Sequence, residues 1–164
     1  MIIRKIEMKD SERFLNMLKQ LDNETTNMML EPGERKTTLE EMNTNIKNIN
    51  NSNSLRLVAE DKGDIIGFLS SERGLVNRIR HRAYIVIGIV KDYRGKKIGV
   101  QLFKELEKWA LESNITRLEL TVMEHNESAI KLYEKMGFKR EGLKINSLLV
   151  DGKYVDEYYM GKIL

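Results

Sequence analysis

The sequence has 164 residues, a length typical of one domain with its own hydrophobic core. It contains no cysteine, which excludes a disulfide framework and an acyl-cysteine intermediate and fits a reducing compartment. The net charge of +3 comes from 28 basic and 25 acidic residues, too mixed to indicate a nucleic-acid-binding protein by itself. No segment has the apolar length of a membrane span or a signal peptide. We therefore expect a single domain over residues 1–164 in the cytoplasm.

The N-terminal part predicts one strand and two helices. The segment "IIRKI" alternates as a strand does, and "DSERFLNMLKQL" has the apolar period of a helix with Asp10 as its N-cap. Thr38 and Glu41 have the spacing of a capping box, which predicts a second helix from Thr38 to about Asn48. The loop between the two helices contains "EPGER".

The remainder alternates between strands and helices. The segments "LRLVAE", "IIGFLSSE" and "AYIVIGIV" predict a three-stranded meander whose first turn is "DKGD". A helix with Ile98, Leu102 and Leu106 on one face follows, and then the strand "RLELTV". Another helix runs from about Asn126 to Met136 and ends at Gly137, and two last strands flank "VDGK". The fold class is α/β with a mixed sheet.

The turn in "YIVIGIVKDYRGKKIGVQLF" leads from a strand into the N-terminus of a helix. Such a turn gathers unpaired backbone amides at the positive end of a helix dipole, which favours an anion such as phosphate. The alternative is that Gly95 and Gly99 only permit the turn and close packing, with Arg94, Lys96 and Lys97 solvated. The chain has neither GxxxxGK[ST] nor GxGxxG, so the better-known nucleotide loops are not indicated.

A second informative stretch is "LELTVMEHNESAIKLYEKMGFKREG". Asn126 stands where a helix starts, Tyr133 lies seven residues later, and Gly137 closes the helix. Each residue also has a purely structural interpretation: Asn126 as an N-cap, Gly137 as a C-terminal cap, and Tyr133 as an aromatic side chain at the edge of the core.

Together, "IGIVKDYRGKKIG" and "NESAIKLYEKMGF" resemble the GNAT family of N-acetyltransferases, which move an acetyl group from acetyl-CoA to an amine. The resemblance implies a mixed, mostly antiparallel, twisted seven-stranded sheet flanked by about four helices. The pyrophosphate loop of the family is Arg or Gln, two residues, Gly, one residue, then Gly or Ala. Arg94 and Gly99 match it, whereas Lys97 occupies the position of the first glycine.

The resemblance also implies residue roles, and we expect no metal. Tyr133 matches the tyrosine that hydrogen-bonds the sulfur of CoA as it leaves, and Asn126 matches a position near the pantetheine arm. The other implied cofactor-binding residues are Ile87, Ile89 and Val90 on the strand and Arg94, Gly95, Lys96, Lys97, Gly99 and Val100 in the loop. A thiol near pKa 8.5 and a phenol near 10 make full proton transfer uphill by about 2 kcal/mol. We therefore expect Tyr133 to stabilise the thiolate before protonating it.

The acceptor must react as a free amine, which for a lysine-like pKa near 10.4 costs about 4.6 kcal/mol at pH 7. Glu72, at the end of a strand, is our candidate for the general base, acting directly or through water. A solvated glutamate is the alternative, and Tyr84 is a weaker candidate base. The resemblance implies that the loop between the first two helices borders the acceptor, so Glu31 and Glu34 in that loop predict an acidic rim and a cationic acceptor.

Other chemistries find little support. His81 and His125 have no partners at metal-ligand spacing. The run Met28, Met29 and Leu30 either lines a substrate pocket or, the interpretation we favour, anchors the loop to the core. The basic run from Arg73 to Arg82 has few interleaved aromatic residues, so a solvated hairpin is favoured over a nucleic-acid surface.

The sequence therefore predicts an acetyl-CoA-dependent N-acetyltransferase that acts by direct attack of an amine of a small molecule or peptide. The alternatives are a noncatalytic CoA- or anion-binding module and a basic RNA-binding protein. We expect an edge strand in "YVDEYYM" and hence a homodimer.

Overall fold

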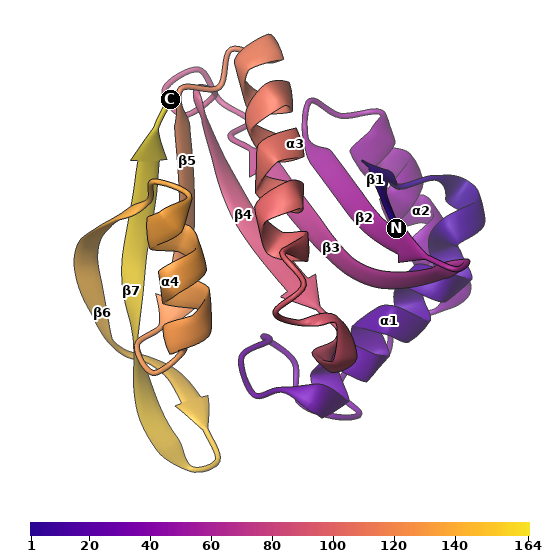
Figure 1. The fold of residues 1–164 in the computed structure, drawn as a ribbon, viewed down its shortest axis with the longest axis horizontal. Coiled ribbons are helices and arrows are strands. Elements are labelled where there is room, and N and C mark those ends of the chain that lie inside the picture. Colours follow the sequence, from indigo (N-terminus) through magenta and orange to yellow (C-terminus); the bar gives the residue numbers. More distant parts are fainter.

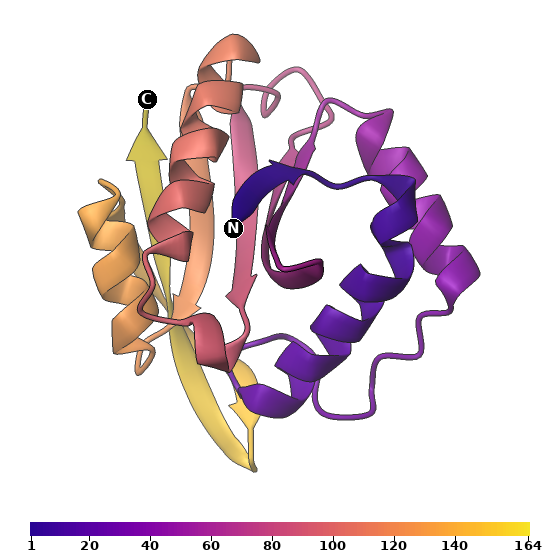
Figure 2. The same cartoon turned by 45° about the vertical axis from the view of Figure 1, so that its right-hand side comes forward.

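A computed structural model describes residues 1–164 as one seven-stranded sheet with helices on both faces (Figures 1 and 2). The strands are β1 Ile2–Lys5, β2 Leu55–Asp61, β3 Asp64–Arg73, β4 Arg82–Ile89, β5 Arg117–Met123, β6 Lys139–Val150 and β7 Lys153–Ile163. The helices are α1 Ser11–Glu24, α2 Leu39–Asn50, α3 Ile98–Glu112 and α4 Glu127–Lys135, with short 3-10 turns at Met8–Asp10 and Lys91–Tyr93. The expected α/β class is confirmed. No helix is long and apolar enough to cross a membrane.

The strand order is β1-β2-β3-β4-β5-β7-β6, and β4 with β5 is the one parallel pair. Its ladder covers only Arg82–Tyr84 against Arg117–Glu119, beyond which the two strands diverge (Figure 1). The expectation that "YVDEYYM" lies at an edge is wrong. The chain crosses through α4 to the far side of the sheet, forms β6 there, and returns as β7 between β5 and β6. The edge strand at this end of the sheet is therefore β6.

The two faces of the sheet have separate cores because successive strand residues point to opposite sides. Leu57 packs with Leu102 and Phe103 of α3 on one face, where α4 also packs. The next residue of β2, Val58, packs with Phe14 of α1 on the other face, where α2 completes the second core. Figures 1 and 2 show α3 and α4 on one side of the sheet and α1 and α2 on the other.

Several predicted boundaries are confirmed by their hydrogen bonds and backbone angles. The Glu41 amide donates to Thr38 Oγ1 at 3.1 Å and the Thr38 amide donates to Glu41 Oε2 at 2.8 Å, which closes the capping box of α2. Gly63 in the β2–β3 turn has φ +91°, and Gly137 after α4 has φ +89°, both in the left-handed region that glycine adopts without strain.

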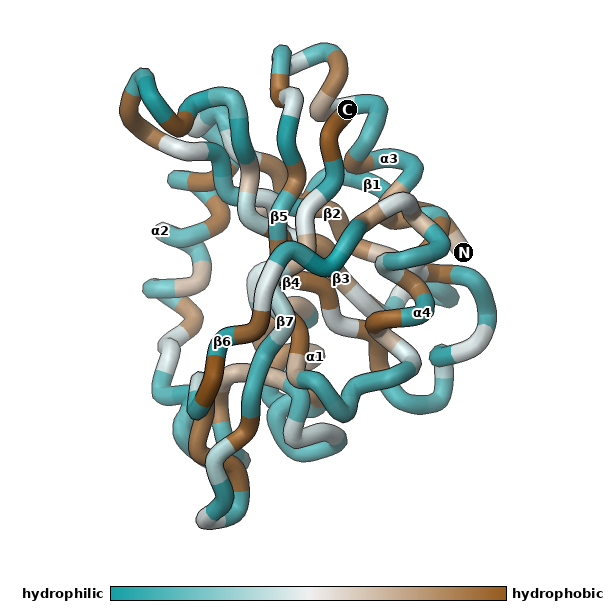
Figure 3. Tube along the Cα trace, turned by 90° about the vertical axis from the view of Figure 1, so that its left-hand side faces the viewer, coloured by the Kyte–Doolittle hydropathy of each residue, from teal (hydrophilic) through white to brown (hydrophobic).

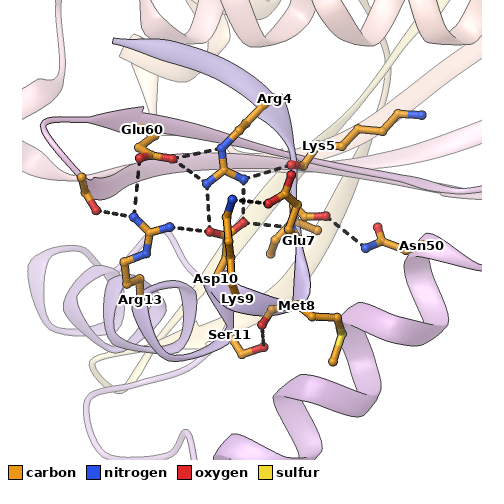
Figure 4. A network of polar contacts seen from close by, with 12 residues as sticks. Arg4, Lys5, Glu7, Met8, Lys9, Asp10, Ser11, Arg13, Asn50 and Glu60 are labelled. Atoms are coloured by element: carbon orange, nitrogen blue, oxygen red, sulfur yellow. Dashed lines mark hydrogen bonds and ion pairs between the residues drawn. The ribbon is translucent and has the colours of Figure 1, made fainter.

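Asp10 precedes α1 as expected, but its side chain does not cap that helix. Its buried carboxylate accepts hydrogen bonds from Arg4 Nη1 at 2.6 Å, Arg13 Nη2 at 2.5 Å and the Glu7 amide at 2.8 Å (Figure 4). Arg4 Nε also donates to Glu60 at 3.0 Å, so the network joins β1, α1 and β2. Burial opposes the charge of Asp10, but these hydrogen bonds outweigh it and lower its pKa to about 2.

Because the pKa of Asp10 is depressed in the folded state, its charge stabilises the fold above the ordinary pKa of 3.8, and this contribution is lost as pH falls toward 2. Asp10→Asn should lower the free energy of unfolding at pH 7 by about 2 kcal/mol and weaken its pH dependence between about pH 4 and pH 2. Urea unfolding over a pH series measures both. The control is Glu105→Gln, which removes an exposed carboxylate paired with Lys108. Equal losses in the two variants would contradict the role of Asp10.

Candidate functional site

The divergence of β4 from β5 leaves backbone groups of β4 without a partner strand. The Val90 amide donates to the Ile66 carbonyl of the β3 side at 3.0 Å. Because antiparallel ladders alternate, Ile87 and Ile89 direct their backbone groups the other way, toward β5. No ladder exists there beyond Tyr84. This open stretch of strand edge can pair with the amide groups of an extended ligand.

Some backbone groups at the end of β4 are already hydrogen-bonded within the chain. Val90 uses its amide for Ile66, and its carbonyl accepts from the Tyr93 amide at 3.0 Å. The Ile89 carbonyl accepts from Arg94 Nε at 2.9 Å, which ties the turn after β4 to the strand. The groups left for a ligand are therefore those of Ile87 and the amide of Ile89.

The turn that follows supplies a run of free donors. The amides of residues 95–100 donate to no backbone or side-chain acceptor, and the first helical hydrogen bond runs from Gln101 to the Lys97 carbonyl at 3.2 Å. They lie at the positive end of the dipole of α3, so an anion is favoured at this position. Lys96 Nζ lies 4.7 Å from the centre of the Tyr93 ring, so this charge is already engaged with an aromatic side chain.

Glycine is favoured at two positions of the turn for different structural reasons. Gly95 has φ +75°, which favours glycine, and a Cβ there would meet no atom within 4 Å. A Cβ on Gly99 would lie 2.6 Å from Leu132 Cδ2, so glycine there lets α3 approach α4. Gly95 and Gly99 therefore do serve the turn and the helix packing, as the purely structural interpretation expected. These roles leave the backbone amides of the turn free. Lys97, where the resemblance places a glycine, adopts the left-handed conformation with φ 63°.

Tyr133 lies on α4 and belongs to the core that α3 and α4 form on one face of the sheet. It is 8% exposed, and its ring packs against Phe103 and Phe138 at centroid distances of 5.8 and 6.1 Å. Burial, and secondarily the nearby Tyr84, raises the pKa of Tyr133 above its ordinary value of 10. Its phenol therefore stays protonated near neutral pH and can donate a hydrogen bond. Tyr84 itself hydrogen-bonds Thr121 Oγ1 at 2.8 Å, which bridges β4 and β5 near the end of their ladder.

Two other predicted residues lie at the margins of this opening. Asn126 is the N-cap of α4, since its Oδ1 accepts from the Ala129 amide at 3.3 Å; its Nδ2 makes no hydrogen bond within the chain and stays available. Glu72 is exposed on β3 directly opposite Tyr84 and forms no ion pair. No group of three or more His, Cys, Asp or Glu side chains is arranged to hold a metal ion.

A cavity of about 610 Å³ lies beside the C-terminal end of α1. Its walls come from the end of α1, the loop to α2, the end of β5 and the β6–β7 turn. The lining residues are Asp22, Asn23, Glu24, Thr25, Thr26, Met28, Met29, Leu30, Glu31, Pro32, Met123, Leu148, Leu149, Val150 and Asp151. They include four carboxylates and no lysine or arginine, so the cavity favours a cationic ligand.

The carboxylates of the cavity are not equivalent. Asp22 accepts from Arg35 Nε at 2.6 Å, and Glu24 accepts from the Lys91 amide at 2.8 Å. Glu31 and Asp151 form no ion pair. Of the acidic rim predicted from the loop, Glu31 lines the cavity, whereas Glu34 accepts a hydrogen bond from the Glu31 amide at 2.7 Å and so supports it.

The methionine-rich run lines this cavity, contrary to the core packing favoured from sequence. Met28 does pack partly against the second core, but Met29 is 75% exposed. Sequence reasoning missed residues Leu148–Asp151, because the strand period cannot tell which loop a hairpin turn will meet. Their one signal was the "VDGK" turn itself.

Residues 15–138 match the acetyltransferase (GNAT) family. An L-amino acid N-acetyltransferase of Escherichia coli (strain K12) is 35% identical over 115 residues, covering 66% of this chain and 67% of that protein. A spermidine N(1)-acetyltransferase of the same strain is 30% identical over 156 residues, covering 93% and 80%. The crystal structure of an acetyltransferase of the GNAT family from Streptococcus pneumoniae superposes with a TM-score of 0.96 at 32% identity, over 99% of each chain.

Lys97 makes a testable contribution to stability. A residue with a Cβ in the left-handed region costs about 1 kcal/mol relative to glycine, so Lys97→Gly should raise the free energy of unfolding by about that amount. Urea unfolding measures it. Lys96→Gly is the matched control because Lys96 lies outside the left-handed region, and it should not stabilise. No gain for Lys97→Gly over this control would show that the observed backbone angle is not imposed by the fold.

Proposed function

The chain belongs to the GNAT family of acetyltransferases, and from this premise we propose that it transfers the acetyl group of acetyl-CoA directly to a primary amine of a small cationic acceptor. One observation supports the proposal above the others. The free amides of residues 95–100 adjoin the unpaired edge of β4, so an anion site and an extended-ligand site form one continuous track.

The residues present fit acetyl-CoA along this track. Amides 95–100 suit the pyrophosphate, because each charge-assisted hydrogen bond contributes about 1.5–3 kcal/mol. Arg94 holds the turn against Ile89, and the side chain of Lys97 is exposed where it can meet the phosphates. The backbone of Ile87 and the amide of Ile89 suit the pantetheine amides, and Asn126 Nδ2 is an additional donor. The residues that we propose to bind acetyl-CoA are thus Ile87, Ile89, Arg94, Gly95, Lys96, Lys97, Gly99, Val100, Asn126 and Tyr133. Val90 is left out because its amide and its carbonyl are both hydrogen-bonded within the fold.

The proposed chemistry needs one hydrogen-bond donor and one proton acceptor. Acetyl-CoA supplies the activated acyl carbon, and the acceptor nitrogen replaces sulfur on it, so that the C–N bond forms as the C–S bond breaks. Tyr133 donates a hydrogen bond to the departing sulfur. Its raised pKa makes full proton transfer still less favourable, which strengthens its role as a donor over its role as an acid. Glu72, directly or through water, takes the proton that the amine loses.

The acidic cavity is our reason for a cationic acceptor. An amino acid would bring its carboxylate toward a lining that has no lysine or arginine and contains the unpaired carboxylates of Glu31 and Asp151. Of the two activities named for the relatives, spermidine acetylation therefore matches this cavity better than amino acid acetylation. A peptide amine remains the alternative acceptor, and a rate that stays high toward neutral pH would favour an α-amine.

We also propose a homodimer that works in the cytoplasm, as the sequence predicts. The edge strand β6 pairs only with β7, and it presents exposed Leu143, Ile145 and Leu149. Figure 3 shows hydrophobic segments along β6. An unpaired edge with apolar side chains suits pairing with a second copy.

Tyr133→Phe tests the catalytic assignment. Removing the phenolic hydroxyl should lower kcat by about 100-fold, because the leaving sulfur loses its donor. It should leave acetyl-CoA binding unchanged, because the proposed hydrogen bond strengthens only as the sulfur departs. Steady-state kinetics with a primary amine and calorimetry with acetyl-CoA measure the two effects. Unchanged kcat would remove Tyr133 from the mechanism. A wild-type chain that binds acetyl-CoA and turns over no amine would favour the noncatalytic alternative.

A further inference from the structure

Glu157 of β7 is a buried carboxylate that the chemistry above does not use. It is 8% exposed and forms no ion pair with any lysine or arginine of the chain, including Lys144, its cross-strand partner on β6. Its Oε2 accepts a hydrogen bond from Ser147 Oγ, whereas Oε1 accepts none and is not sealed from solvent. A buried carboxylate without a cationic partner is costly in a fold, so a bound cation would be stabilised there.

A bulge in β6 positions the hydrogen-bond donor of the Glu157 carboxylate. The β6–β7 ladder shifts register between Lys144 and Leu148, which marks a bulge in β6. Within the bulge, Asn146 has φ 51° and its amide donates to Asp156 Oδ1 at 2.7 Å. The same bulge brings Ser147 to Glu157. Bulges commonly redirect a side chain beside a functional site.

Glu157 lies on the cavity face of the sheet. It is the cross-strand partner of Met123, so the two side chains emerge on the same face, and Met123 lines the 610 Å³ cavity. Met123 is two residues beyond Thr121, which bonds Tyr84 at the end of the parallel ladder. Two residues of rise and one strand spacing place the Glu157 backbone about 8 Å from that of Thr121. This backbone offset is comparable to the length of a diamine.

We propose that Glu157, positioned by Ser147, binds the second ammonium group of a diamine acceptor whose first amine is acetylated, so it is a specificity-determining residue. This inference rests on the proposed function. The apolar lining contributed by Met28, Met123 and Leu148 suits the methylene chain between the two charges. The uncharged hydroxyl of Ser147 holds the carboxylate without neutralising it.

Three acceptors of similar length test the proposal: cadaverine, pentylamine, which lacks the distal ammonium, and ε-aminocaproate, which carries a distal carboxylate. The wild-type chain should prefer cadaverine over both in kcat/KM. Glu157→Gln should lower kcat/KM for cadaverine by about 10- to 100-fold, the range of one charge-assisted hydrogen bond, and should leave pentylamine unchanged. Ser147→Ala should reduce the same preference to a smaller extent. Glu141→Gln is the matched control, since Glu141 is exposed on the same hairpin and pairs with Arg117.

The outcomes separate this inference from the proposed function. Equal losses for cadaverine and pentylamine in Glu157→Gln would indicate a structural role and overturn the inference. So would a wild-type chain that acetylates both amines equally well, although acetyl transfer itself would then stand. If Glu157→Gln does not fold, an unchanged cadaverine preference in Ser147→Ala would overturn it. Acetylation of no amine at all would overturn both proposals.

Discussion

The short parallel ladder between β4 and β5 is the constraint on which the site depends. Only Arg82–Tyr84 pair with Arg117–Glu119, so the strands separate while each keeps its other neighbour. The separation leaves the backbone groups of Ile87 and the amide of Ile89 without a protein partner, and the turn after β4 brings the amides of residues 95–100 to the same track. A longer ladder would satisfy these groups internally and remove the binding edge.

The packing around the opening both buries Tyr133 on one face of the sheet and leaves room for the acidic cavity on the other. Gly99 lets α3 approach Leu132, which brings α4 close enough for Tyr133 to be buried against Phe103. That burial keeps the phenol protonated and dry, as a hydrogen-bond donor to a thiolate requires. On the opposite face the sheet is incompletely covered, and the α1–α2 loop and the β6–β7 turn form the acidic cavity there. Under the proposed function, acetyl-CoA would bind on one side of this sheet opening and the acceptor on the other.

The sequence predicted the elements well where one period dominates. The alternation in β2 to β5 and the caps of α2 and α4 are local signals, and the GNAT motifs identified the family. It misplaced β7, because the order of strands depends on a crossover that no local pattern records. Asp10 was assigned to a cap because its partner Arg4 lies on a separate strand. Glu157 was not predicted because its burial and its lack of an ion pair depend on tertiary structure, including the bulge in β6 that brings Ser147 to it.

The most direct test of the account concerns the free amides of residues 95–100. We would record nitrogen–proton correlation spectra of the isotopically labelled chain during titration with CoA, and separately with pantetheine, which lacks the pyrophosphate. We predict that CoA shifts the amide signals of residues 95–100 and of Ile87 and Ile89, whereas pantetheine shifts only those of the strand. Saturable binding of CoA that leaves the amides of residues 95–100 unmoved would contradict the account.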